Sequence, residues 1–228
     1  MKRSEINDII RGAEAFLAEY RFPLPPFGAW SPEDWAHKGP ECREIVDRGL
    51  GWDITDWGTS DFTHHGLVLF TLRNGTMANL RAGKGKVYSE KVLIVQPGQK
   101  TPLHFHWSKV EDFANRGGGQ LVMTLYNSTP DGELADSEVA VSIDGIERRF
   151  APSEPVPLEP GESISLHTGL YHGFVAARAP TLVIEVATVN DDHGDNRFLE
   201  PVGRFPSIDE DVPPYHLLVG DYAAYYRA

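Results

Sequence analysis

Residues 98–117 read GQKTPLHFHWSKVEDFANRG, and the spacing of their histidines and acids is typical of a metal site built on β-strands. His104 and His106 are two positions apart, so on a strand both imidazoles project from one face. Glu111 follows beyond a segment long enough to turn and return on a neighbouring strand. Two imidazoles and a carboxylate suit divalent Mn, Fe, Co, Ni or Zn and leave coordination positions open for a substrate. A bare pair of histidines is more often a surface feature, so a metal site needs a further ligand.

A second segment, 161–176, reads GESISLHTGLYHGFVA and supplies that ligand. His172 stands beside Gly173, on what the pattern predicts to be another strand after a glycine-bounded turn. We therefore expect His104, His106, Glu111 and His172 to meet around one divalent ion.

Residues 51–190 carry the pattern of an all-β domain. Short apolar stretches alternate with Gly, Pro, Asn and Asp clusters that favour turns. Strands bounded this often predict a sandwich or barrel. Helices and strands do not alternate along this region, so a parallel α/β sheet is not expected. The expected strands include residues 67–72, 91–96, 120–126, 138–143 and 181–189.

The two ends of the chain have a different character. Ser4 is a candidate cap for a helix reaching about residue 20, and Ser31 with Pro32 predicts a second helix to about residue 48. Residues 191–228, rich in Pro, Asp and aromatics, predict ordered coil wrapping the barrel. We expect a single domain, with a helical extension (1–50), a β-barrel (51–190) and a C-terminal segment (191–228).

Together the two histidine segments resemble the two signature motifs of the cupin superfamily. The first motif is matched throughout, at Gly98, His104, His106, Glu111 and Gly117 or Gly118. The second is matched at Gly161, Gly169 and His172, but His167 replaces its proline and Ala176 replaces its asparagine. These departures fall on turn and strand positions and leave the ligands intact. The resemblance implies an all-β cupin jelly-roll barrel with the metal inside.

A closer resemblance, to the bacterial D-lyxose isomerases, covers nearly the whole chain. It is carried by the N-terminal helices and by LPPF (24–27), TLRNG (71–75), HFHWSKVED (104–112), LYHGF (170–174) and NDDHGDNRFLEPVGRFP (190–206). The resemblance implies a Mn²⁺-dependent homodimer, with Co²⁺ as an alternative ion. It also implies interconversion of D-lyxose with D-xylulose, and of D-mannose with D-fructose, through a metal-stabilised enediolate.

Moving a hydrogen between C1 and C2 of an open-chain sugar also needs an acid or base beside those carbons. Lys109, in the first motif, is a candidate substrate binder or acid/base. Glu200 ranks first among the carboxylates because it lies in the most family-like stretch. Glu185 ranks second because an acid inside an apolar strand needs a partner or a polar cavity. Glu210 is a further candidate, and surface placement is the simplest alternative for each acid.

Composition excludes several partners. The formal net charge of −12 disfavours nucleic acid and anionic membrane, both of which require clustered Lys and Arg. A single cysteine excludes an internal disulfide and favours a reducing compartment. With neither a signal-peptide pattern nor an apolar run long enough for a membrane span, we expect a cytoplasmic protein that binds a small monosaccharide.

Other functions use the same four ligands. An Fe-dependent cupin dioxygenase and a non-catalytic sugar-binding cupin are the main alternatives. A cupin-type glucose-6-phosphate isomerase would need an anion site, and no Lys/Arg cluster lies near the motifs. The preferred sugar, the metal used in the cell, the choice between proton transfer and hydride shift, the base and the oligomer stay open.

Overall fold

The structure is a computed structural model and describes residues 1–192, 194–203 and 207–227. Part of the family-like segment 190–206 therefore lies outside the described residues. The helices are α1 (Arg3–Glu19), α2 (Pro32–Ala36), α3 (Arg43–Asp47), α4 (Phe62–His65), α5 (Met77–Ala82) and α6 (Tyr222–Tyr225), with 3₁₀ turns η1 (Pro26–Ala29), η2 (Pro40–Cys42) and η3 (Val219–Asp221). Within these ranges, no helix combines the length and apolar character needed to cross a membrane.

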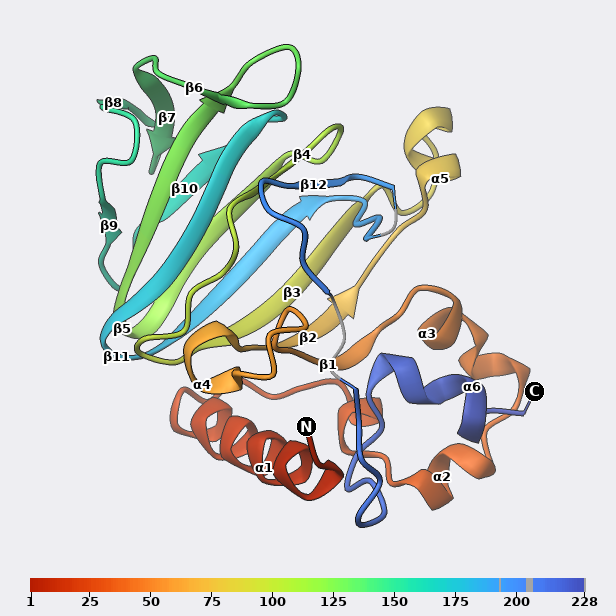
Figure 1. Cartoon of the computed structure of the whole chain (residues 1–228). Helices are drawn as coiled ribbons and strands as arrows, with labels where there is room; N and C mark the ends of the chain where they lie inside the picture. Colours follow the sequence, from red (N-terminus) through yellow and green to blue (C-terminus); the bar gives the residue numbers. More distant parts are fainter. Residues whose placement is uncertain (193, 204–206, 228) are drawn as a thin grey trace.

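The strands form one antiparallel sheet (Figure 1). They are β1 (Gly51–Thr55), β2 (Leu67–Arg73), β3 (Tyr88–Val95), β4 (His104–His106), β5 (Glu111–Ser128), β6 (Leu134–Ala135), β7 (Val139–Ile143), β8 (Ile146–Phe150), β9 (Val156–Leu158), β10 (Ser163–Leu166), β11 (Leu170–Thr188) and β12 (Asn196–Phe198). The main path runs β1-β2-β3-β11-β5-β10-β7-β8, while β4 pairs with both β11 and β12. The predicted all-β antiparallel fold with N-terminal helices is confirmed.

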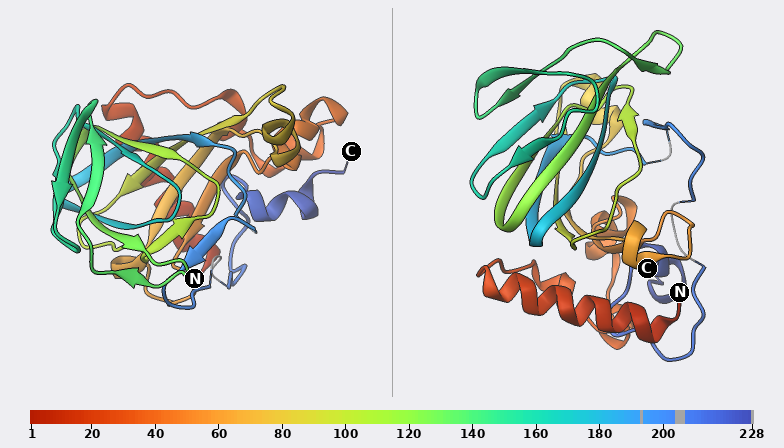
Figure 2. Two further views of the ribbon diagram at one scale, coloured as in Figure 1. Left: turned by 90° about the horizontal axis from the view of Figure 1, so that it is seen from above. Right: turned by 60° about the vertical axis from the view of Figure 1, so that its left-hand side comes forward.

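Two long strands, β5 and β11, form the spine of the sheet and curve strongly (Figure 2). Their pairing is interrupted by register shifts near residues 117 and 181. Gly118 has a φ of +89°, and a Cβ there would lie 2.0 Å from the carbonyl oxygen of Pro180. Only glycine permits so close an approach in that conformation, so this position allows both strands to bend.

The strands β1, β2, β3 and β11 are buried on both faces because α1 covers the outer one (Figure 1). Ile6, Ile10, Ala13 and Leu17 recur at helical spacing and pack against outward-facing residues such as Val92 and Ile184. Alternate residues of the same strands face inward, and these include Lys91 and Leu93 of β3. Because α1 lies on the outer face, the inward-facing residues of these four strands can line a cavity.

Two details of the predicted helices are wrong. The helix expected over residues 32–48 is broken into α2, η2 and α3, because Gly39 and Pro40 interrupt it. The first helix is capped by Lys2 rather than by Ser4, whose hydroxyl donates to Asp211 at 2.7 Å.

The C-terminal segment is more than coil. It adds β12 to the free edge of β4 and returns to the N-terminal helices through η3 and α6. Arg3, which is 1% exposed, holds this return by pairing with both Glu210 and Asp221. That the whole chain forms one domain remains a prediction.

Candidate metal centre

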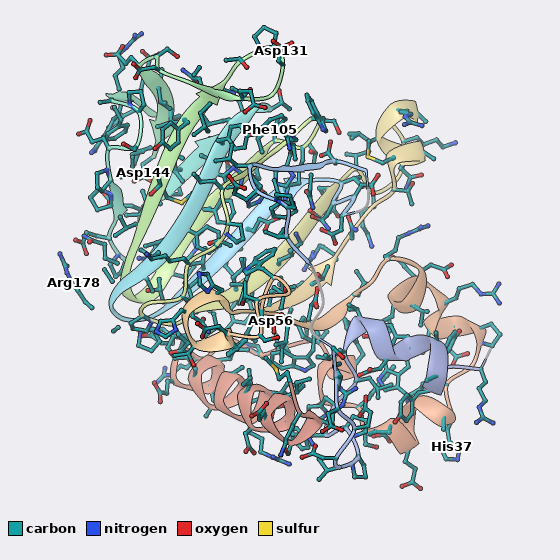
Figure 3. The ribbon with its side chains drawn as sticks, in the orientation of Figure 1. His37, Asp56, Phe105, Asp131, Asp144 and Arg178 are labelled. Carbon is teal, nitrogen blue, oxygen red and sulfur yellow. The ribbon has the colours of Figure 1, made fainter. Side chains whose placement is uncertain are left out.

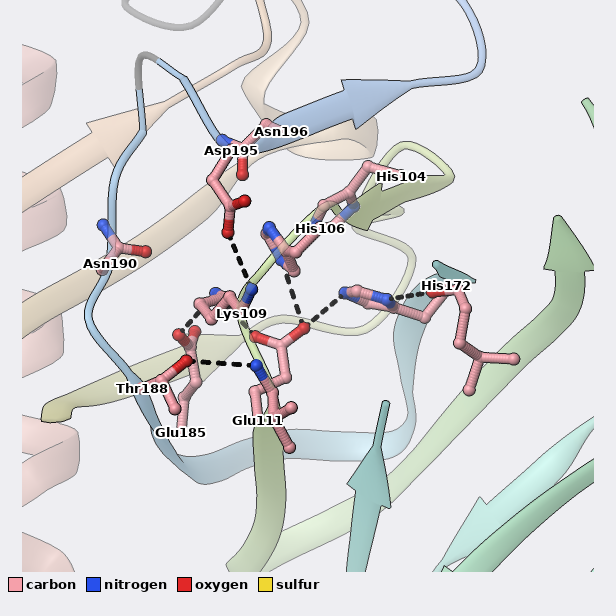
Figure 4. Close-up of polar contacts among 12 residues, drawn as sticks. His104, His106, Lys109, Glu111, His172, Glu185, Thr188, Asn190, Asp195 and Asn196 are labelled. Atoms are coloured by element: carbon pink, nitrogen blue, oxygen red, sulfur yellow. Dashed lines mark hydrogen bonds and ion pairs between the residues drawn. The ribbon is translucent and has the colours of Figure 1, made fainter. Parts of the chain in front are cut away.

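The four predicted ligands come from three neighbouring strands. His104 and His106 project from the same face of β4, as their spacing predicts, and Glu111 is the first residue of β5. His172 lies on β11 directly opposite His104 in the antiparallel register. The structure thus brings the two distant sequence segments together at one point (Figure 4).

Distances within this group are short enough for a shared ion. The ligand atoms of His104, His106 and His172 all lie within 4.8 Å of one another. Glu111 Oε1 lies 3.2 Å from His106 Nε2 and 3.0 Å from His172 Nε2. All four side chains therefore present donor atoms to one small volume.

Backbone contacts orient two of the imidazoles. His104 Nδ1 lies 2.9 Å from the carbonyl oxygen of Pro102, and His172 Nδ1 lies 3.0 Å from that of Leu170. A carbonyl accepts only from N–H, so both rings carry a proton on Nδ1 and direct Nε2 towards the site. Burial lowers the pKa of His104 well below its usual range, with His172 and His106 adding to the effect. Burial and then Lys109 lower the pKa of His106, so the imidazoles of His104 and His106 stay neutral at pH 7.

Several buried nitrogen and oxygen atoms that could bind a metal ion make no hydrogen bond of normal geometry. They are both ring nitrogens of His106, both carboxylate oxygens of Glu111 and Nε2 of His172. Ion-pair distances link some of these atoms, yet their alignment is poor for hydrogen bonding. Leaving a buried polar atom unsatisfied costs about 1–3 kcal/mol. A divalent cation would satisfy His172 Nε2, one ring nitrogen of His106 and a carboxylate oxygen of Glu111, so the residues fit a transition-metal ion.

A chain of alternating charges leads away from the histidines along the inner face of the sheet. Lys109 Nζ lies 2.6 Å from Glu111 Oε2 and donates to Glu185 Oε1 at 3.0 Å. The same Glu185 oxygen accepts from Lys91 Nζ at 3.0 Å, because Lys91 lies directly opposite Glu185 on β3. Lys91 also donates to Asn190 Oδ1 at 2.7 Å. All four charged side chains are buried.

Pairing offsets the effect of burial on the pKa values of three of these side chains. Burial alone would lower the pKa of Lys109, but Glu111 and Glu185 raise it above its usual value, so the ammonium stays protonated. Burial opposes ionisation of Glu111, but Lys109 and then His172 hold its pKa well below the usual range. Burial likewise opposes ionisation of Glu185, while Lys109 and Lys91 lower its pKa. Lys109, Glu111 and Glu185 are therefore ionised at neutral pH.

A cavity of about 940 Å³ opens onto this group. The inner faces of β1, β2, β3, β5 and β11 form much of its wall. Its polar lining residues away from the histidines include Asp53, Thr55, Thr71, Lys91 and Asn190. Phe198 of β12 stacks on His104 with 5.2 Å between ring centroids and covers one side of the site.

The structure separates the predicted catalytic candidates. Lys109 and Glu185 are buried and line the cavity beside the histidines. Glu200 is exposed just after β12 and is not among the described residues that line the cavity. Glu210 pairs with Arg3 beneath the sheet.

Three polar residues at the site were missed at the level of sequence. Lys91 begins a predicted strand and could have been noticed as a charge in an apolar run, as Glu185 was. Asp195 and Asn190 lie in the family-like tail, but nothing in their spacing indicates contact with the site. Asp195 is buried and contacts the turn that carries Lys109.

The chain is similar to known sugar isomerases along nearly its whole length. The family model of D-lyxose isomerase matches residues 1–222. The chain is 44% identical over 225 residues to a D-lyxose/D-mannose isomerase of Escherichia coli O157:H7, covering 97% of this chain and 98% of that protein. The corresponding protein of Serratia proteamaculans is also 44% identical, with the same coverage. The fold is similar to that of Cellulomonas parahominis L-ribose isomerase solved with L-ribose, with a TM-score of 0.60 at 19% identity over 92% of this chain and 98% of that one.

Proposed function

We propose, from the premise that this chain belongs to the D-lyxose isomerase family and is a sugar isomerase, that it interconverts D-lyxose with D-xylulose. D-mannose and D-fructose are proposed as a slower pair, in keeping with the names of the relatives. The observation that carries the proposal is the buried chain Glu185–Lys109–Glu111, which ends on the three-histidine cluster.

His104, His106, Glu111 and His172 are the residues proposed to hold the ion, and Mn²⁺ is the proposed occupant. Mixed imidazole and carboxylate donors suit Mn²⁺, with Co²⁺ as an alternative. When bound, the ion would supply Lewis-acid polarisation of the carbonyl and adjacent hydroxyl oxygens of the open-chain sugar. Neutral His104 and His106 support this assignment, because a protonated imidazole has no lone pair to donate.

Lys109 is proposed to act as a cationic hydrogen-bond donor to the sugar oxygens. Its raised pKa keeps a proton on Nζ and argues against the alternative role of general base. It would stabilise negative charge that develops on oxygen as a hydrogen leaves carbon.

Glu185 is the proposed base, taking the proton from C2 of the aldose and returning it to C1. It is ionised, lines the cavity and lies one ammonium group away from Glu111. Glu200, ranked first from sequence, is the rival, and its exposure favours Glu185. Glu185 is buried within β11, so bulk water has little access to its carboxylate.

The cavity lining supports a neutral sugar as substrate. Lys91 and Lys109 are already paired with Glu185, and a third lining cation, Arg48, is outnumbered by lining acids such as Asp47 and Asp53, so the cavity is poorly suited to a phosphate. Lining groups such as Thr55, Thr71 and Asn190 suit hydroxyl recognition. A homodimer is proposed from the family resemblance, and a cytoplasmic location from the one cysteine, Cys42.

Incubation of the metal-stripped protein with D-lyxose, with and without Mn²⁺, tests the proposal. D-Xylulose should appear only with the ion, and its absence in the presence of bound Mn²⁺ would refute the assignment. Oxygen uptake during turnover would instead favour the dioxygenase. Deuterium from D₂O should enter the ketose at C1, whereas full retention of label from D-[2-²H]lyxose would indicate a hydride shift and remove the base role of Glu185.

A further inference from the structure

Asp195 is a buried carboxylate in the loop that precedes β12. Its Oδ1 accepts hydrogen bonds from Ser108 N at 2.7 Å and from Ser108 Oγ at 2.6 Å. Its Oδ2 accepts from Lys109 N at 2.9 Å, and its backbone carbonyl accepts from Trp107 N at 3.1 Å. Asp195 therefore binds three consecutive residues of one turn.

That turn joins β4 to β5 and lies between two proposed metal ligands, His106 and Glu111. Lys109 sits within it, and its buried side chain reaches both Glu111 and Glu185. The path of the backbone at Lys109 decides where Nζ lies relative to those carboxylates (Figure 4). A carboxylate bonded directly to Lys109 N–H is well placed to fix that path, since hydrogen bonds to an ionised acceptor are stronger than neutral ones.

We propose that Asp195 is a positioning residue, which holds the backbone of Lys109 so that its ammonium bridges Glu111 and Glu185. This inference rests on the proposed function, in which Lys109 contacts the sugar. Asp195 acts through Lys109 and touches neither the ion nor the substrate. The loop before β12 thus contributes to the active site through Asp195, which supports the turn that carries Lys109.

Because Asp195 Oδ1 binds Ser108 and Oδ2 binds Lys109, a single substitution can test the proposal. In Asp195→Asn, the amide oxygen can keep both Ser108 contacts, which is the orientation that loses least. The amide NH₂ then faces Lys109 N–H, so two donors oppose each other and the Lys109 contact is lost. Ser108→Ala is the complementary change, because it removes one hydroxyl contact and leaves Lys109 held.

A second Asp–Ser pair in the same protein provides a matched control. Asp144 Oδ1 accepts from Ser163 N at 2.9 Å and from Ser163 Oγ at 2.8 Å, in the turn between β7 and β8. Figure 3 shows Asp144 well apart from Phe105 of β4. Asp144→Asn repeats the loss of charge and the amide replacement away from the cavity.

Steady-state kinetics of D-lyxose isomerisation and Mn²⁺ content should be measured for each variant. In Asp195→Asn we expect kcat to fall about 10- to 100-fold, the range for lost outer contacts and small misplacements at a site. KM and Mn²⁺ content should stay within about twofold, a split that general loosening of the fold would not produce. Ser108→Ala and Asp144→Asn should keep kcat within about twofold of the unmodified enzyme.

The proposal is overturned if Asp195→Asn keeps its kcat, or if its loss of rate follows a loss of Mn²⁺. If Asp195→Asn is insoluble, Asp195→Glu replaces it, because the longer side chain displaces the carboxylate while preserving its charge. An unchanged kcat in Asp195→Glu would also overturn the proposal. Combining Asp195→Asn with Lys109→Gln should add little to Lys109→Gln alone, whereas multiplicative losses would show independent action. An unmodified enzyme without isomerase activity would refute the proposed function instead.

Discussion

Replacing Lys109 by Met removes the charge that two buried carboxylates share. Lys109 Nζ lies 2.6 Å from Glu111 and 3.0 Å from Glu185, and Lys91 remains beside only the second of them. Removing one partner from a buried ion pair costs about 3–5 kcal/mol. At about 2–4 °C per kcal/mol for a chain of this size, the melting temperature in chelator should fall by about 6–20 °C.

Metal should offset part of this loss. An ion bound by Glu111 supplies the positive charge that the variant lacks, so Mn²⁺ should raise the melting temperature of Lys109→Met by more than that of the unmodified protein. Lys86→Met is the matched control, because Lys86 pairs with Glu44 at the surface and such pairs contribute at most about 1 kcal/mol. A fall of under about 2 °C in chelator, or equal gains with Mn²⁺, would contradict the charge-sharing argument.

The same variant has a defined pH dependence. The folded pKa values of Glu111 and Glu185 are lowered, so their pairing stabilises the protein above the unfolded Glu pKa of about 4.3. That contribution is lost as pH falls through the folded values. The stability difference between the unmodified protein and Lys109→Met should therefore be full at pH 7 and shrink below about pH 4 in urea titrations.

Four further substitutions separate the roles assigned above. Glu185→Gln should keep Mn²⁺ and lose kcat by about 10²- to 10⁴-fold, whereas Glu200→Gln should stay near the unmodified rate; the opposite pattern in steady-state kinetics would make Glu200 the base. His106→Ala should abolish both Mn²⁺ binding by calorimetry and turnover, and bound Mn²⁺ in this variant would exclude His106 as a ligand. Arg3→Met should lower the free energy of unfolding in urea by about 3 kcal/mol without changing kcat, since it breaks pairs with Glu210 and Asp221, and none of the three lines the cavity; unchanged stability would show that those pairs contribute nothing.

Much of the site could be predicted because its spacing follows from strand geometry. The two-residue separation of His104 and His106 places both on one face, and the signature around His172 identified the strand that lies opposite. Glu185 was detectable as an acid inside an apolar strand. The pairing of Glu185 with Lys91 could not be predicted, because it depends on the register between β3 and β11. Hydrophobic alternation does not distinguish registers that differ by two residues.

The features that were not predicted depend mainly on contacts between residues that are far apart in the sequence. Asp195 lies 87 residues from the serine it binds, and no local pattern encodes that pairing. Glu200 was ranked first for its family-like neighbours, and its exposed position could not be read from that proximity, which says nothing about which way a side chain faces. The broken helix over residues 32–48 had a visible signal in Gly39-Pro40, which outweighs the favourable start at Ser31.

The pairing of β4 with β12 has a consequence for biosynthesis. The histidine strand is bordered on one side by β11 and on the other by residues 196–198, so its second neighbour is synthesised after the other strands of the sheet. Until residues 196–198 have left the ribosome, β4 keeps an unpaired edge and His104 lacks the ring of Phe198 that stacks on it. A chain interrupted before residue 196 would carry the histidines and Glu111 without this neighbour.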